Sequence, residues 1–505
     1  MAATLEASGI DRHSVSARLV RTSTLACQYA VRNWLIAFAI TLAAVSTAAD
    51  ALAAEGSAEG LPNIVLVYCD DAGYGDFGCY GNSRIRTPAV DRLAQEGMRF
   101  TDFYVAQAVC SASRTSLLTG CYPNRVGILG ALGPNSQIGI HDDELTLGEL
   151  LQSRGYATAA YGKWHLGDNP RFLPARHGFD DYFGLPYSND MWPKHPERPG
   201  AFPSLPLISG VKTVETDPDQ SRLTRRYTDH AVAFIEQHHA KPFFVYLPHT
   251  MPHVPIFASD DFRGQSVAGL YGDVIEEIDN SLDRISKTLE ELRIDEKTIV
   301  IFASDNGPWL SYGNHAGTAG PLREGKGTTF EGGVRVPCVV RWPGHVPAGT
   351  ICREPAMTID WLPTLAAISG AALPQDRVLD GQDISPLLMG EAGAVSPHEA
   401  LYFYWGRALE AVRAGRWKLH LPHRYRTLPP GERGRDGLPV KYAEAAIGTE
   451  LFDLAEDPAE KHNVADGHPD IVARLQALAE QARQDLGDSA TGQQGKNVRA
   501  PGNLR

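Results

Sequence analysis

The chain has 505 residues, enough for one large α/β domain and a second, smaller one. Its net charge of −13 is spread along the sequence, so no basic stripe suited to nucleic acid is present. An acidic surface also repels polyanions at long range, so any site for an anion must be a local cluster of Lys, Arg, His or metal.

The first 53 residues have the features of an export signal. An apolar run follows Arg32, and Ala51-Leu52-Ala53 fits the A-x-A pattern of a cleavage site. The run is short for a membrane span, which disfavours an uncleaved anchor. We therefore predict a signal peptide with a long leader over residues 1–53, export to the periplasm or secretion, and no membrane span in the mature chain.

Strand and helix patterns alternate along roughly the next 345 residues, from 54 to 398. Amphipathic or helix-like segments are expected at 88–97, 146–155 and 358–370, and a longer one is marked by apolar residues at steps of three and four: Ile275, Ile278, Leu282, Ile285, Leu289 and Leu292. Apolar runs of strand length lie at 61–68, 156–165, 242–248, 297–304 and 336–342. This alternation predicts a mixed or parallel sheet covered by helices on both faces, in a catalytic domain over residues 54–398.

The pattern changes near residue 399. The segment 400–421 has the apolar and polar texture of antiparallel strands, and 468–487 is an amphipathic helix pattern. We predict a smaller α+β subdomain over residues 399–487 and a disordered tail over 488–505.

Two of the predicted strands are followed directly by acidic or amide pairs. Asp70-Asp71 follows the first strand, and Asp305-Asn306 follows the strand at 297–304. Open α/β sheets bind ligands just beyond the carboxyl ends of their strands. A strand-to-turn cap would explain either pair alone. Both pairs together favour a hard cation such as Ca²⁺ or Mg²⁺, because such ions prefer oxygen ligands.

Cys110 begins a segment of helical character, and Arg114 lies one turn further along on the same face. A helix N-terminus lowers the pKa of a thiol, so a thiolate nucleophile is one interpretation and a packed small residue is the other. The six cysteines beyond the leader are too sparse for a disulfide framework, although one or two bridges stay open.

Three further segments supply cationic or imidazole side chains. Lys163 and His165 lie two apart at a strand end, which directs both to one face. His249 and His253 follow another strand, and Lys326 lies in a Gly-rich loop. Each of these alone could be a solvated residue or a satisfied histidine. Together they predict a cationic pocket beside a metal, suited to a sulfate or phosphate ester.

Several sequence blocks then occur in a specific order. The motif CSASR at 110–114, followed by LTG at 118–120, resembles the C-x-[P/A]-x-R signature of the formylglycine-dependent (type I) sulfatases. The blocks VYCDDAGYGDFGCYG, GKWHLG, PHTMPHVP, SDNG and GKGTTFEGGVRVP are similar to other sulfatase blocks in the same order, and LFDLAEDPAEKHNV resembles the C-terminal segment of the family. The branch most resembled is that of arylsulfatase A and N-acetylgalactosamine-6-sulfatase. Many members have Pro where this chain has Ala112, which is an accepted variant.

The resemblance implies an α/β, alkaline-phosphatase-like fold and a sulfuric ester hydrolase of the arylsulfatase type. A formylglycine-generating enzyme would oxidise Cys110 to 3-oxoalanine (formylglycine), whose hydrate would attack the sulfur atom and form a covalent sulfo-enzyme. Ca²⁺, in preference to Mg²⁺, would be bound by Asp70, Asp71, Asp305, Asn306 and an oxygen of residue 110.

The resemblance also implies roles for the cationic residues. Arg114 and Lys163 would hold the formylglycine oxygens, and His165 would be the base that collapses the sulfo-enzyme. His253 and Lys326 would bind the sulfate and assist the leaving alcohol, with Lys163 also in contact with the substrate. His249 is the weaker of the two neighbouring histidine candidates.

Other functions stay open at this point. A phosphatase or phosphodiesterase of the same superfamily would need further His and Asp metal ligands around a Thr or Ser nucleophile. A silent binder of sulfated glycans, with Cys110 unconverted, would not need His165. A papain-like hydrolase would place its cysteine on another architecture. The substrate, an aryl sulfate or a sulfated sugar, is expected to be selected by loops such as 186–210 and 422–441.

Overall fold

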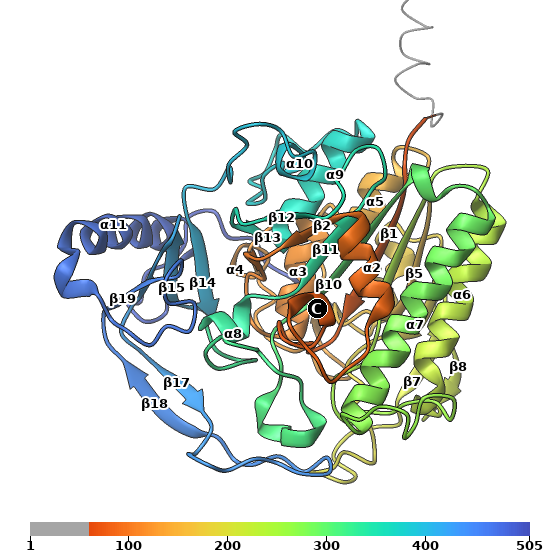
Figure 1. Cartoon of the computed structure of the whole chain (residues 1–505), viewed down its shortest axis with the longest axis horizontal. Helices are drawn as coiled ribbons and strands as arrows, with labels where there is room; N and C mark the ends of the chain where they lie inside the picture. Colours follow the sequence, from red (N-terminus) through yellow and green to blue (C-terminus); the bar gives the residue numbers. More distant parts are fainter. Residues whose placement is uncertain (1–59, 505) are drawn as a thin grey trace, which may run out of the picture. The chain divides into compact units, whose positions relative to one another are not determined.

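A ten-stranded mixed sheet lies at the centre of the described residues, 60–504, in the computed structural model (Figure 1). The strand order is β12-β2-β11-β10-β1-β9-β5-β6-β7-β8. The bounds are β1 (Asn63–Cys69), β2 (Met98–Phe100), β5 (Ala157–Lys163), β6 (Asp181–Leu185), β7 (Pro206–Ser209), β8 (Lys212–Thr216), β9 (Phe243–Pro248), β10 (Thr298–Ser304), β11 (Cys338–Arg341) and β12 (Thr350–Cys352). The adjacent strands β10, β1, β9, β5 and β6 run parallel, so their carboxyl ends share one edge of the sheet.

Helices cover both faces of this sheet, as the sequence predicts. One face packs on α2 (Pro88–Glu96), α6 (Leu223–His238) and α7 (Leu270–Glu291), and the other on α3 (Cys110–Thr119), α5 (Leu147–Gln152) and α9 (Trp361–Ser369). Strand β1 shows why: Val65 and Val67 belong to the core under α6 and α7, whereas Ile64 and Leu66 belong to the core on the opposite side. Successive side chains of a strand point to opposite faces, so a strand buried on both sides is apolar throughout.

The C-terminal part forms a second, smaller sheet. Strands β14 (Leu401–Trp405), β15 (Ala408–Ala414), β16 (Trp417–His420) and β19 (Glu450–Asp453) are antiparallel, and α11 (Pro469–Leu486) packs on them. A separate hairpin pairs β17 (His423–Thr427) with β18 (Ala443–Ile447). Further short elements are β3 (Phe103–Tyr104) with β13 (Ala356–Met357), α4 (Pro123–Val126), α8 (Glu331–Val334) and α10 (Ser385–Leu388).

The predicted disordered tail is wrong for the described residues up to 504. Strand β20 (Gly502–Asn503) pairs with β4 (Ile138–Gly139), and Arg499 forms an ion pair of 2.6 Å with Glu144. These are contacts between residues far apart in the sequence. A polar, Gly-containing segment without periodicity does not reveal them, which is why the sequence pattern alone suggested disorder.

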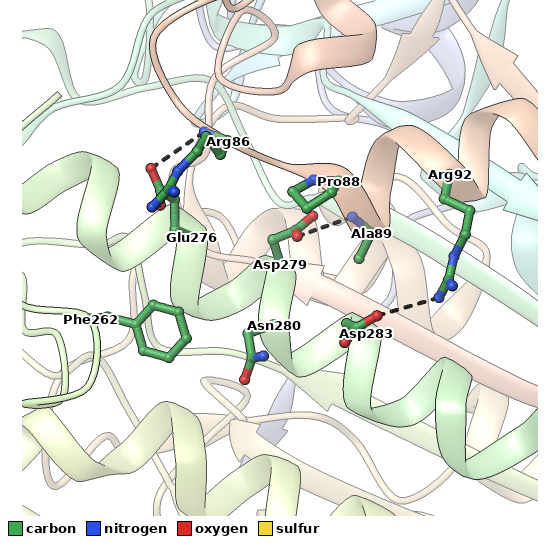
Figure 2. Close-up of a pocket in the computed structure, with 9 residues that line it drawn as sticks. All are labelled: Arg86, Pro88, Ala89, Arg92, Phe262, Glu276, Asp279, Asn280 and Asp283. Atoms are coloured by element: carbon green, nitrogen blue, oxygen red, sulfur yellow. Dashed lines mark hydrogen bonds and ion pairs between the residues drawn. The ribbon is translucent and has the colours of Figure 1, made fainter. Parts of the chain in front are cut away.

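Helix α2 receives its N-terminal cap from another helix. Its preceding residue, Thr87, makes no side-chain cap. The Asp279 carboxylate on α7 instead accepts a hydrogen bond of 3.0 Å from the backbone N–H group of Ala89 (Figure 2), and one of 2.9 Å from that of Val90. A cavity of about 420 Å³ lies beside this contact. Burial raises the pKa of Asp279 to about 7. The cap is therefore a carboxylate held in surroundings that favour its protonated form.

Two further predictions concern disulfide bridges and membrane-spanning helices. All six cysteines within residues 60–504 are free thiols, so neither of the bridges left open by the sequence occurs there. None of the helices in this range combines the length and apolar character needed to cross a membrane. The predicted signal peptide, residues 1–53, lies outside the described residues.

Candidate active site

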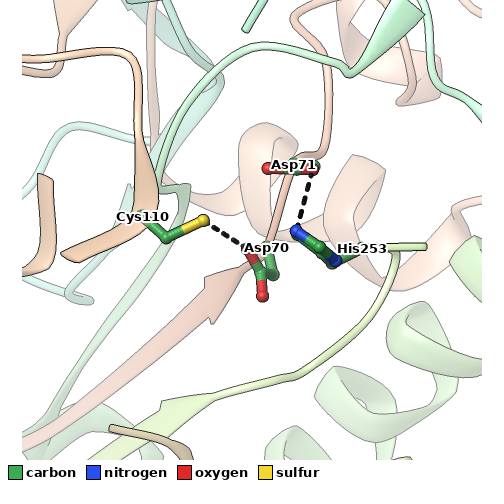
Figure 3. Close-up of side chains that lie close together, drawn as sticks. All are labelled: Asp70, Asp71, Cys110 and His253. Carbon is green, nitrogen blue, oxygen red and sulfur yellow. Dashed lines mark hydrogen bonds and ion pairs between the residues drawn. The ribbon is translucent and has the colours of Figure 1, made fainter. Parts of the chain in front are cut away.

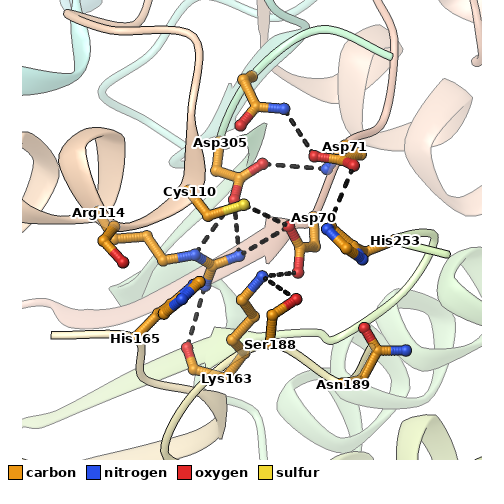
Figure 4. A network of polar contacts seen from close by, with 12 residues as sticks. Asp70, Asp71, Cys110, Arg114, Lys163, His165, Ser188, Asn189, His253 and Asp305 are labelled. Atoms are coloured by element: carbon orange, nitrogen blue, oxygen red, sulfur yellow. Dashed lines mark hydrogen bonds and ion pairs between the residues drawn. The ribbon is translucent and has the colours of Figure 1, made fainter. Parts of the chain in front are cut away.

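The parallel strands bring the predicted site residues together at one edge of the sheet. Asp70 and Asp71 follow β1, Asp305 follows β10, and Lys163 ends β5. Figure 4 shows these side chains converging with Cys110 and Arg114, which come from the first turns of α3. This is the juxtaposition expected from strand ends in an open α/β sheet.

Three buried cations pair with three buried carboxylates. Lys163 Nζ lies 2.5 Å from Asp70 Oδ2, Arg114 Nη2 lies 2.8 Å from Asp305 Oδ2, and Lys326 Nζ lies 2.6 Å from Asp71 Oδ1. Pairs of this kind are required here, because an isolated charge at such depth costs several kcal/mol, roughly.

For Asp70 and Asp305, burial raises the pKa of the carboxyl group, whereas the neighbouring cations lower it. Burial favours the protonated form of Asp70, but Lys163, with His253 and Arg114, outweighs it and holds the pKa of Asp70 well below its usual range. Burial and the nearby Asp70 charge raise the pKa of Asp305. The carboxylate of Asp70 is thus kept ionised, whereas its negative charge opposes ionisation of Asp305.

Cys110 is 2% exposed and lies at the start of α3. Its Sγ atom is 3.2 Å from Lys326 Nζ and 3.6 Å from Asp70 Oδ1. Burial raises the pKa of this thiol to about 12, although Lys163 and Lys326 act against it. The predicted lowering of the thiol pKa at a helix N-terminus is therefore outweighed by desolvation, and the residue is a protonated thiol rather than a ready thiolate.

Ligand atoms suited to a cation gather around Cys110. Single ligand atoms of Asp70, Asp71, Cys110 and His253 all lie within 4.8 Å of one another (Figure 3). Asn306 Nδ2 donates to Asp71 Oδ1 at 2.7 Å, while Asn306 Oδ1 is buried without a hydrogen-bond partner. A buried, unpartnered amide oxygen beside carboxylates is what a hard cation would satisfy, so these residues fit an oxygen-liganded metal.

His165 is a buried histidine with one nitrogen available. Its Nε2 lies 2.8 Å from the carbonyl oxygen of Leu132, so Nε2 must donate, and Nδ1 is left without a proton and without a partner. Burial, with Lys163 and Arg114, holds the pKa of His165 well below its usual range. The residue has a φ of 64°, so its placement comes from a left-handed turn after β5 and not from strand alternation as predicted.

The two later histidines differ. His253 Nδ1 lies 2.6 Å from the carbonyl oxygen of Val254, which directs Nε2 toward Asp71 Oδ2 at 3.7 Å. His249 is also buried, but neither of its ring nitrogens has a hydrogen-bond partner, and burial lowers its pKa to about 3. The geometry therefore associates His253 with the cluster and leaves His249 neutral.

Two residues at the site were missed by sequence reasoning. Ser188 Oγ accepts a hydrogen bond of 3.2 Å from Lys163 Nζ, and it lies in the loop 186–210 that was expected to influence specificity. The indole ring of Trp309 lies 4.7 Å from Lys326 Nζ and 5.5 Å from the His253 ring. Its position three residues after Asn306 is the sequence signal that could have drawn attention to it.

Comparisons with known proteins agree with this geometry. The family profile described as Sulfatase matches residues 62–371, and that of the C-terminal region of aryl-sulfatase matches residues 396–501. Arylsulfatase A of Bos taurus is 40% identical over 457 residues, 85% of this chain and 88% of its own. N-acetylgalactosamine-6-sulfatase of Canis lupus familiaris is 37% identical over 469 residues, 86% of this chain and 88% of its own.

A solved structure extends the likeness to three dimensions. The PsFucS1 sulfatase from Pseudoalteromonas sp. superposes with a TM-score of 0.75 at 28% identity, over 87% of this chain and 92% of that one. The large mixed sheet with its smaller C-terminal sheet is thus the alkaline-phosphatase-like fold of the sulfatases. The chain belongs to the sulfatase family, whose members hydrolyse sulfate esters.

Proposed function

We propose that the protein hydrolyses sulfate monoesters with a formylglycine at position 110. The observation that carries this proposal is the position of Cys110, whose Sγ atom lies 3.2 Å from Lys326 Nζ in a group of paired charges. A thiol with a pKa of about 12 is a poor nucleophile at neutral pH. Oxidation of its CH₂–SH group to an aldehyde by a formylglycine-generating enzyme would instead give a hydrate with two hydroxyl groups on one carbon.

The two hydroxyl groups divide the reaction into two steps. One hydroxyl group gives up its proton to water and its oxygen attacks sulfur. The S–O bond to the alcohol breaks, the leaving oxygen takes a proton from His253 or Lys326, and the covalent sulfo-enzyme remains. The other hydroxyl then loses its proton, the C–O bond to the sulfo group breaks, sulfate leaves and the aldehyde is restored. His165 is the proposed base for this proton, because its Nδ1 is buried, unprotonated and unpartnered.

The cations of the site are proposed to bind the oxygens around the reacting centre. Arg114 and Lys163 hold the oxygens of residue 110, while His253 and Lys326 contact the sulfate and the alcohol oxygen as it leaves. Lys326 is suited to this role, since the residue is 6% exposed and its ammonium lies beside Cys110. A proton from such a group would neutralise the charge that develops on the alcohol.

Ca²⁺, in preference to Mg²⁺, is the proposed metal. Its ligands would be Asp70, Asp71, Asp305, Asn306 and an oxygen of residue 110, and it would supply positive charge beside the sulfate oxygens. In this structure Lys163 contacts the carboxylate of Asp70, and Lys326 contacts that of Asp71. Coordination of the ion by these carboxylates would leave both ammonium groups available to sulfate oxygens.

The remaining assignments are proposals of the same kind. The substrate is a sulfate ester of an aryl alcohol or a sugar, and the protein is exported to the periplasm or secreted, as the leader sequence suggests. We keep residues 54–398 as the catalytic domain and 399–487 as the C-terminal subdomain.

The test is turnover of 4-nitrophenyl sulfate and 4-nitrophenyl phosphate by the wild type and by Cys110→Ala. The proposal expects the wild type to prefer the sulfate and the variant to lose turnover at an unchanged melting temperature. Full activity in the variant would refute it. A preference for the phosphate ester would favour a phosphatase of the same fold.

A further inference from the structure

Arg426 lies directly against the proposed sulfate-binding lysine. It belongs to β17 of the C-terminal hairpin, drawn in blue beside α8 in Figure 1. Its Nε donates a hydrogen bond of 2.8 Å to the backbone oxygen of Lys326, and its Nη2 donates to the same oxygen. A side chain reaching back from 100 residues further along the sequence thus contacts the catalytic loop.

The next residue of that loop, Gly327, makes room for the guanidinium. A Cβ atom at this position would lie 2.3 Å from Arg426 Cζ, and the glycine has a φ of 80°. Its backbone N–H donates to the carbonyl oxygen of Ala108 at 2.9 Å, two residues before Cys110. The guanidinium therefore packs against Gly327, whose N–H group is hydrogen-bonded to the segment that leads to Cys110.

Arg426 differs from the other cations of the site in having no acidic partner. Arg114, Lys163 and Lys326 each pair with a carboxylate, whereas within residues 60–504 no carboxylate oxygen lies within 4.0 Å of the Arg426 guanidinium. The nearby Glu324 accepts a hydrogen bond from Thr427 Oγ1 at 2.7 Å instead. Burial accordingly lowers the pKa of Arg426. Its described contacts are the Lys326 carbonyl oxygen and the face of the Tyr442 ring, whose centroid lies 4.7 Å from Cζ. A half-buried guanidinium with these two partners keeps N–H groups for an anion.

The neighbours of Lys326 indicate that such an anion would belong to the alcohol portion of the substrate. The indole ring of Trp309 lies 4.7 Å from Lys326 Nζ, and the guanidinium of Arg426 contacts the backbone oxygen of the same lysine. An apolar ring face beside a cation suits a ring that carries a charge.

We propose that Arg426 binds a second anionic group, a carboxylate or a second sulfate, on the alcohol portion of the substrate. This inference rests on the proposed sulfate ester hydrolysis and defines its substrate class as esters of acidic rather than neutral alcohols. A guanidinium suits this role because its N–H groups match the oxygens of either anion in a bidentate manner.

The experiment uses three aryl sulfates that differ in the charge of one substituent. They are 3-carboxyphenyl sulfate, its uncharged carboxamide, and the corresponding 3-sulfonate. We expect the wild type to have a higher kcat/KM for the anionic esters than for the carboxamide. Arg426→Gln should lower kcat/KM for an anionic ester by about tenfold or more, while the value for the carboxamide changes by less than about threefold. A greater loss for the carboxylate or for the sulfonate would tell which anion is recognised.

A matched control and a second variant keep the test decisive. Arg424 lies on the same strand, is exposed and pairs with Glu444. Arg424→Gln should therefore leave unchanged the ratio of kcat/KM between the anionic esters and the carboxamide. Arg426→Lys, which retains the charge, should keep an intermediate preference and serves if the Gln variant does not fold.

Equal losses for all three esters would overturn the inference, because Arg426 would then act only by holding Lys326. A wild type without preference for anionic esters would also overturn it. Failure of the wild type to hydrolyse any of the three would instead contradict the proposed function.

Discussion

Lys326 Nζ lies 2.6 Å from Asp71 Oδ1 and only 3.2 Å from Cys110 Sγ. The same ammonium thus joins a proposed metal ligand to the proposed precursor of the nucleophile. Burial disfavours its charge, but Asp71 outweighs burial and raises the pKa of Lys326. The group stays charged at neutral pH, as binding of a sulfate ester requires.

Replacing this lysine should affect binding and rate together. Lys326→Ala removes the charge proposed to contact both the sulfate and the leaving oxygen, so we expect kcat/KM for an aryl sulfate to fall on the order of a hundredfold or more. Steady-state kinetics measure the effect. Lys287→Ala, which removes an exposed lysine on α7, is the matched control and should be neutral. A Lys326→Ala enzyme with unchanged KM and kcat would contradict the assigned role.

The role of His165 predicts a trapped intermediate. Without its free Nδ1, the second step should slow by about 10² to 10⁴-fold, whereas attack on sulfur needs no base at this position. His165→Ala mixed with substrate should therefore release one equivalent of alcohol rapidly and gain a sulfo group. The intact mass of the protein reports this gain.

The exposed histidine variant His239→Ala should turn over normally and gain no mass. If His165→Ala neither accumulated the sulfo group nor slowed, another residue would have to be the base.

Metal removal should lower both activity and stability. Asp70, Asp71 and Asp305 lie together in a buried site, and a bound cation would offset their repulsion. Dialysis against EGTA should suppress turnover and lower the melting temperature, and added Ca²⁺ should restore both. Asn306→Ala should weaken the recovery by Ca²⁺. Full activity after exhaustive chelation would argue against the metal.

Stability should depend on pH through Asp279. Its folded-state pKa is about 7, above the value of about 4 in an unfolded chain. The folded protein therefore binds the proton more tightly, so this stabilising contribution is complete below about pH 4 and is lost as the pH rises through 7. Loss of this contribution lowers the free energy of unfolding by roughly a few kcal/mol.

Scanning calorimetry between pH 5 and pH 8 measures this contribution. Relative to the wild type, Asp279→Asn should gain in melting temperature as the pH rises, because the variant has no proton to lose. Asp283→Asn, on the same helix, serves as the control. Parallel curves for the wild type and Asp279→Asn would show that Asp279 does not titrate in this range.

The sequence predicts the framework of this protein better than its local geometry. Apolar runs locate β1 and β10, and the polar pairs that follow them indicate a shared edge because parallel strands end together. Asp71 and His165 nevertheless both have φ values in the left-handed region, at 67° and 64°. Asp and His adopt such conformations more often than most residues, but tertiary contacts decide where they do so.

Long-range contacts account for the other differences. Arg426 reaches Lys326 across 100 residues, and the segment around Arg499 is held by Glu144, which no local pattern reveals. The helix start left either a thiolate or a packed small residue open for Cys110, and the burial that decides between them depends on the whole fold. Local sequence gives helix position, whereas desolvation is a property of the assembled core.

The mass of the tryptic peptide 100–114 from protein made in its native host tests the central claim most directly. This peptide contains Cys110 and Ala112, and it ends at Arg114. We predict a mass in which the thiol is replaced by an aldehyde, together with turnover of sulfate esters. An intact thiol in enzyme that hydrolyses sulfate esters would contradict the formylglycine mechanism, and an intact thiol in inactive protein would favour an unconverted binder of sulfated glycans.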